Sequence, residues 1–112
     1  TKWEPEKPQE GVIISTIDEL NSIKDPELRA LKYFCFIARS QIFIDGNKRV
    51  AQLMANKILI DNDIGIFQID IDDLEEFKML LISFYESNDD TAIIDFMQQH
   101  CVKRCAVSYD EL

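Results

Sequence analysis

Apolar residues recur at helical spacing along four long stretches of this chain, so most of its length suits amphipathic helices. These stretches span residues 25–40, 47–61, 72–86 and 89–105, and a weaker one spans 17–24. The first is apolar around most of its girth, which is typical of a helix at the centre of a fold. The pattern predicts an all-α fold.

Residues typical of helix boundaries frame these stretches. Asp25 is a good N-cap before Pro26, and Glu75 follows Asp72 as in a capping box. Asn62 and Gly65 stand where the second helix should end. The faces expected to point inward are, in chain order, Leu28, Leu31, Phe34, Cys35 and Ala38; Val50, Leu53, Met54 and Ile58; Leu74, Phe77, Leu81, Phe84 and Tyr85; and Ile94, Met97, Cys101 and Cys105.

Two further segments lack a helical pattern. Residues 1–11 are polar and contain two prolines, which predicts an extended arm leading to the short apolar stretch 12–14. Residues 66–71 alternate apolar and polar side chains, as an extended crossing segment does. We expect an arm over 1–14, one helical domain over 15–107 and a tail over 108–112.

Composition limits the possible functions. The 112 residues, 46% of them hydrophobic, are enough for one core. The formal net charge of -9 makes nucleic acid and anionic membranes unfavourable partners, and no apolar run approaches the roughly 18 residues of a membrane span. The three cysteines are an odd number without framework spacing, so we expect reduced thiols and a cytoplasmic protein.

One segment is not explained by packing. Between two apolar stretches it places Asp45, Gly46, Asn47, Lys48 and Arg49 in consecutive positions, with a helix beginning inside the run. A helix start exposes unpaired N–H groups and a partial positive charge, which attract anions. Glycine permits close approach and positive φ, Asn can cap the helix or hold an anion, and the two cations can bind phosphate. The carboxylate is of the kind that holds Mg²⁺ beside phosphates. As an isolated string, the same run would also suit a solvated helix–loop–helix corner.

The sequence from Gln41 to Arg49 resembles the signature of the Fic family, H-x-F-x-[D/E]-G-N-[G/K]-R-x-x-R. Six positions match in register: Phe43, Asp45, Gly46, Asn47, Lys48 and Arg49. The helices on either side agree with the family, as do the later sequences FYE and DFM, so the resemblance spans roughly residues 15–107.

The resemblance implies a function and a role for each matched residue. Fic proteins transfer AMP from ATP to a hydroxyl of a target protein. The implied roles are Mg²⁺ binding for Asp45, phosphate binding for the four residues from Gly46 to Arg49, and an inward anchor for Phe43. The implied partners are therefore ATP with Mg²⁺ and a target protein.

Gln41 stands where the family has a histidine that acts as general base. A glutamine amide cannot accept a proton, and loss of a positioned base costs about 10²- to 10⁴-fold in rate. Gln52 replaces the second motif arginine, which weakens the expected grip on the triphosphate. Lys48 in place of the second glycine resembles the Doc branch, whose members phosphorylate their targets. We therefore predict a nucleotide-binding protein with impaired transfer; the alternatives are a kinase or other transferase that uses the variant motif, and a non-enzymatic interaction module.

Three weaker features of the sequence also bear on function. Ser15 and Glu19 have the spacing of the family's inhibitory helix, but Leu20 follows where Gly or Asn should stand, so amphipathic packing is the favoured interpretation. The family's target-docking flap would fall near residues 12–14, or in residues that precede this sequence. His100 with Cys101 and Cys105 could suggest a metal site, but adjacent helical residues point about 100° apart, so core cysteines and a surface histidine are favoured.

Overall fold

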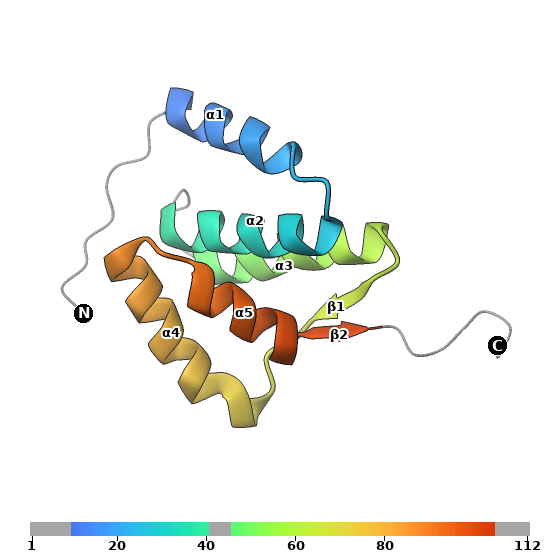
Figure 1. The fold of residues 1–112 in the computed structure, drawn as a ribbon, viewed down its shortest axis with the longest axis vertical. Helices are drawn as coiled ribbons and strands as arrows, with labels where there is room; N and C mark the ends of the chain where they lie inside the picture. Colours follow the sequence, from blue (N-terminus) through green and yellow to red (C-terminus); the bar gives the residue numbers. More distant parts are fainter. Residues whose placement is uncertain (1–9, 41–45, 105–112) are drawn as a thin grey trace, which may run out of the picture.

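The structure, a computed structural model, describes residues 10–40 and 46–104. This part of the chain contains five α-helices and one pair of short strands (Figure 1). The helices are α1 (Glu10–Asn21), α2 (Pro26–Ser40), α3 (Asn47–Asp61), α4 (Leu74–Ser87) and α5 (Thr91–His100). The strands are β1 (Gly65–Phe67) and β2 (Val102–Arg104), and a 3₁₀ turn, η1 (Ile71–Asp73), leads into α4. The predicted all-α class is confirmed.

Helix α2 forms the centre of the molecule. It passes between α1 and α5, with α3 running alongside it (Figure 1). Asp25 caps its start as predicted, because its Oδ1 accepts a hydrogen bond from the Glu27 N–H at 3.1 Å. The Phe34 ring packs against Phe67 of β1 and Phe77 of α4, with ring centroids 5.0 and 5.9 Å away. The buried residues of this helix are Ala30, Leu31, Tyr33, Phe34, Cys35, Ile37 and Ala38.

Helix α3 has the predicted span, and three of the four residues predicted to point inward, Val50, Met54 and Ile58, pack against the core, but its fully buried line lies beside them. Its buried residues recur every four positions and are Asn47, Ala51, Ala55 and Leu59. The two alanines let α3 approach the bulky residues of α2 closely. The larger side chains of α3 therefore lie at the edges of the contact between α2 and α3. Leu53, predicted to point inward, is 64% exposed, whereas Val50, Met54 and Ile58 are half-buried.

The strand pair corrects the prediction for the C-terminal part. Helix α5 ends at His100 and not near Cys105, because β2 pairs antiparallel with β1 in the register Phe67↔Val102. Cys105 itself lies outside the described residues. The extended segment predicted over 66–71 is confirmed for β1, but Ile71 already belongs to η1. Cys101 and Met97 are fully buried, as predicted for core residues.

Helix α4 buries Phe77, Leu81 and Phe84 as predicted. Its start differs from the prediction, because η1 precedes it and the N-cap is Asp73, whose side chain makes no capping hydrogen bond. The capping box expected from Asp72 is therefore wrong. Leu74 is the first residue of the helix and is 37% exposed.

Helix α1 begins earlier than the sequence pattern indicated. Residues 10–14 are its first turns, so the extended arm expected to reach Gly11 and the flap expected near residues 12–14 are both wrong for this segment. The expected boundary after residue 14 falls inside this helix. Val12 and Ile14 are more than half exposed. Among residues 10–21 only Leu20 is buried, so α1 forms with little burial of its side chains.

Candidate functional site

The candidate phosphate site lies at the start of α3. Gly46 is the N-cap of this helix and has φ 76° and ψ 21°, a left-handed conformation that glycine adopts without steric cost. Its carbonyl oxygen accepts the first helical hydrogen bond, from the Val50 N–H at 2.9 Å. The turn therefore presents the open end of α3, where N–H groups and the helix dipole favour an anion. The predicted positive φ of Gly46 is confirmed.

Among the described residues, Asn47 is the one polar residue that is buried, with 7% of its surface exposed. Buried side-chain nitrogen and oxygen atoms in that part all have hydrogen-bond partners, so Asn47 is engaged within the protein. A satisfied, buried amide fixes the first turn of α3 against the core. Of the two uses predicted for Asn47, this position favours holding the helix start in place.

Lys48 and Arg49 project from the same turn and are exposed. Neither side chain forms an ion pair with another residue of the described segments. Two such cations beside a helix start can approach an anion without first breaking an internal pair. Gln52, one turn later, is half-buried.

The remaining predicted site residues, Gln41, Phe43 and Asp45, lie outside the described residues. Their predicted roles stay predictions. Among the residues that are described, no group of His, Cys, Asp and Glu could hold a metal ion.

The end of α2, which leads to the motif, is tied to α4. The Arg39 Nε donates a hydrogen bond to the Tyr85 carbonyl oxygen at 3.2 Å. Burial raises the pKa of the Tyr85 hydroxyl to about 12, and the neighbouring Cys35 contributes to a smaller extent. Burial likewise raises the pKa of the Cys35 thiol to about 12, with Asp90 adding to the effect. Both groups stay protonated at neutral pH, so neither is an activated nucleophile.

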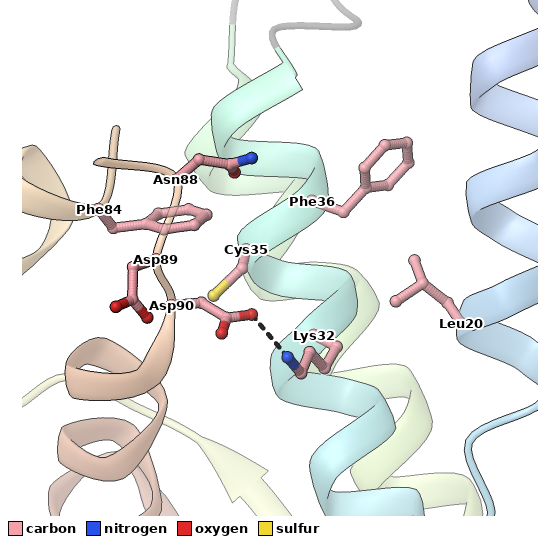
Figure 2. Close-up of a pocket in the computed structure, with 8 residues that line it drawn as sticks. All are labelled: Leu20, Lys32, Cys35, Phe36, Phe84, Asn88, Asp89 and Asp90. Atoms are coloured by element: carbon pink, nitrogen blue, oxygen red, sulfur yellow. Dashed lines mark hydrogen bonds and ion pairs between the residues drawn. The ribbon is translucent and has the colours of Figure 1, made fainter. Parts of the chain in front are cut away.

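A pocket of about 460 Å³ lies between α1, α2 and the turn that joins α4 to α5 (Figure 2). Its rim includes an ion pair of 2.8 Å between Lys32 Nζ and Asp90 Oδ2. These residues are far apart in the sequence, and no local pattern indicated that they would meet. The pocket is lined by Leu20, Lys32, Cys35, Phe36, Phe84, Asn88, Asp89 and Asp90.

The positions of His100 and of the Ser15–Glu19 pair in α1 agree with a surface histidine and with amphipathic packing. His100 is exposed at the end of α5, stacks beside Phe96 and has its Nδ1 3.8 Å from Asp73 Oδ1. That end of α5 lies near the strands, whereas α3 begins at the opposite end of the molecule (Figure 1). In α1, Ser15 and Glu19 are exposed and Leu20 is buried, which fits amphipathic packing.

The model of the Fic/DOC family matches residues 4–59 of this sequence. The chain belongs to the Fic/DOC family. The match covers α1, α2 and nearly all of α3, and so includes the turn at Gly46. Comparisons with curated proteins and with solved structures gave no match. No helix in the described part of this Fic/DOC protein is long and apolar enough to cross a membrane.

Proposed function

We propose that this Fic/DOC protein binds ATP with Mg²⁺ at the start of α3 and transfers AMP to a target protein slowly, because Gln41 replaces the family's histidine. The observation that carries the proposal is the left-handed Gly46 N-cap with Lys48 and Arg49 exposed beside it. The first N–H groups of α3 bind phosphate oxygens, and Arg49 adds a bidentate contact. Lys48 supplies a second positive charge.

Asp45 and Gln41 define the chemistry that remains. In this proposal the Asp45 carboxylate holds Mg²⁺, which neutralises phosphate charge when it is bound. The Gln41 amide can donate and accept hydrogen bonds but cannot take the proton of a target hydroxyl. Transfer is therefore slower than with a positioned base by about 10²- to 10⁴-fold.

Nucleotide binding is tested by thermal unfolding of the 112-residue chain with and without millimolar ATP–Mg²⁺. Ligand at ten to a hundred times Kd stabilises by about 1.4 to 2.7 kcal/mol, which corresponds to a rise of several degrees in Tm. Arg49→Ala should abolish the rise. Lys57→Ala, which removes an exposed cation from the same helix, is the matched control and should keep it. No rise in the wild type would contradict nucleotide binding and favour an interaction module.

The missing base is tested separately with Gln41→His. This variant should increase transfer of label from α-labelled ATP to protein targets in a lysate, while the Tm rise stays as in the wild type. Lys48 motivates a second candidate, a Doc-like kinase, because Lys occupies this position in the Doc branch. A kinase would transfer label from γ-labelled ATP and not from α-labelled ATP. Bound ATP with no gain from Gln41→His would contradict the missing-base account.

A further inference from the structure

The outward side of α3 carries an apolar stripe that nothing in the described structure covers. Leu53 and Ile60 are 64% and 55% exposed, and they lie two helical turns apart on one line. Arg49 continues this line toward the start of the helix, and Lys57 flanks it. We call Arg49, Leu53, Lys57 and Ile60 the α3 stripe. It combines two apolar side chains with two cations, in a chain whose net charge is -9.

Helix α4 carries a stripe of the same length and the opposite charge. Glu75, Met79, Ile82 and Glu86 follow one another at spacings of four, three and four, so all lie on one line of the helix. Met79 and Ile82 are 68% and 40% exposed, and both glutamates are exposed. Neither glutamate pairs with a cation of the described segments. We call these residues the α4 stripe.

The two stripes are complementary in length, polarity and charge. Each extends about 16 Å along its helix, with apolar side chains that can pack against those of the other. Glutamates at both ends of the α4 stripe reach the cations of the α3 stripe whichever way the two helices run. Lys57 is held by Asp61 at 3.0 Å, which leaves Arg49 as the cation of the stripe that has no ion pair within residues 10–40 and 46–104. The two stripes do not cover each other within one chain, because Leu53, Ile60, Met79 and Ile82 all stay exposed.

We propose that the α3 stripe of one chain binds the α4 stripe of a second copy of the same chain. We take this contact to be heterologous, so that each copy of a dimer keeps one stripe free for a further copy. Only two apolar side chains on each side are buried, which is less than the roughly 800 Å² per partner of a stable complex. Association is therefore weak and depends on concentration. The proposal does not require nucleotide binding.

Sedimentation velocity of the full chain over a wide range of concentration tests the proposal. The weight-average sedimentation coefficient of the wild type should rise with concentration. Leu53→Glu places a negative charge opposite the glutamates of the α4 stripe, and Met79→Lys places a positive charge opposite the cations of the α3 stripe. Each variant should weaken association by at least about tenfold. Both positions are more than 60% exposed, so the fold tolerates the change. Ile71→Lys is the matched control, because Ile71 is 85% exposed and lies outside both stripes; it should associate as the wild type does.

Mixing the two variants identifies the pairing. Leu53→Glu keeps an intact α4 stripe and Met79→Lys keeps an intact α3 stripe, so an equal mixture should form dimers that neither variant forms alone. A wild type that is monomeric throughout overturns the proposal and leaves the stripes for another protein or another segment. A Met79→Lys variant that associates like the wild type, or a mixture that stays monomeric, also overturns it.

Discussion

Gly65 and Gly46 both have positive φ, but their surroundings give the two positions different tolerance. A Cβ at Gly65 would lie 2.0 Å from the Lys103 carbonyl oxygen, so β1 and β2 would have to separate. A Cβ at Gly46 would meet nothing within 4 Å, so only the backbone conformation opposes a side chain there. We expect Gly46→Ala to cost about 1 kcal/mol of unfolding free energy and Gly65→Ala clearly more, about 2 to 4 kcal/mol.

Urea unfolding of both variants measures this difference. Gly11→Ala is the control, because Gly11 lies in α1 with open space around it and alanine favours a helix by up to about 1 kcal/mol. Equal costs at Gly46 and Gly65 would mean that the close approach of the strands is not the cause.

The site residues could be predicted where their role depends on local sequence, and not where it depends on tertiary packing. The turn at Gly46 follows from glycine before a helix start, and the sequence alone indicates it. The exposure of Leu53 could not be predicted from the sequence. The helical period shows which residues share a face, but the neighbouring helix decides which face is buried. The partner, α2, is bulky and takes the alanine side of α3. The Lys32–Asp90 ion pair joins residues 58 positions apart and has no local signal.

At the scale of elements, Asn56 connects α3 to the edge of β1. Its Oδ1 accepts a hydrogen bond from the Phe67 N–H at 2.7 Å, and its Nδ2 donates one to the Phe67 carbonyl oxygen at 3.2 Å. The amide thus takes the place of a neighbouring strand. Asn56→Ala should cost about 1 to 3 kcal/mol in urea unfolding, because it leaves two half-buried backbone groups without partners. Lys57→Ala, an exposed neighbour, should change stability by less than about 0.5 kcal/mol. A similar effect of both variants would contradict this role.

Helix α1 is attached by fewer interactions than the other helices. Leu20 is its buried residue, and the Tyr33 hydroxyl donates a hydrogen bond of 2.5 Å to the Asn21 Oδ1 at its end. We expect backbone amides of α1 to exchange with deuterium well before those of α2, since local opening exposes little apolar surface. Leu20→Ala should accelerate exchange in α1 and leave α2 unchanged. Equal protection of the two helices would show that α1 opens only when the whole domain unfolds.

Most helix boundaries could be read from the sequence, whereas the strands could not. Asp25-Pro26 and Asn62 are strong local signals, and α2 and α3 begin and end beside them. β2 continues an apolar pattern that also suits a helix, and it becomes extended because β1 is available for pairing. The first turns of α1 were missed because Gly11 and the nearby prolines favour an extended chain locally.

At the scale of the whole molecule, the burial of cysteine thiols and tyrosine hydroxyls makes the free energy of unfolding depend on pH in the alkaline range. Burial is the largest cause of a raised pKa at four groups. The pKa rises from 9.0 to about 12 for Cys35, from 9.0 to about 11 for Cys101 and from 10.0 to about 12 for Tyr85, and it is also raised for Tyr33. Above about pH 9 the unfolded chain releases these protons while the folded chain retains them. The unfolded state then binds fewer protons, so stability falls as pH rises.

The fall should begin near pH 9 and continue toward pH 12, with up to about 1.4 kcal/mol lost per pH unit for each group that titrates only in the unfolded state. Below about pH 8 these groups contribute no pH dependence. Urea unfolding at a series of pH values measures the slope for the wild type and for Cys35→Ala. The variant starts less stable, because it leaves a cavity, but its stability should fall less steeply between pH 9 and 11. Parallel slopes would show that the Cys35 thiol is not what links folding to alkaline pH.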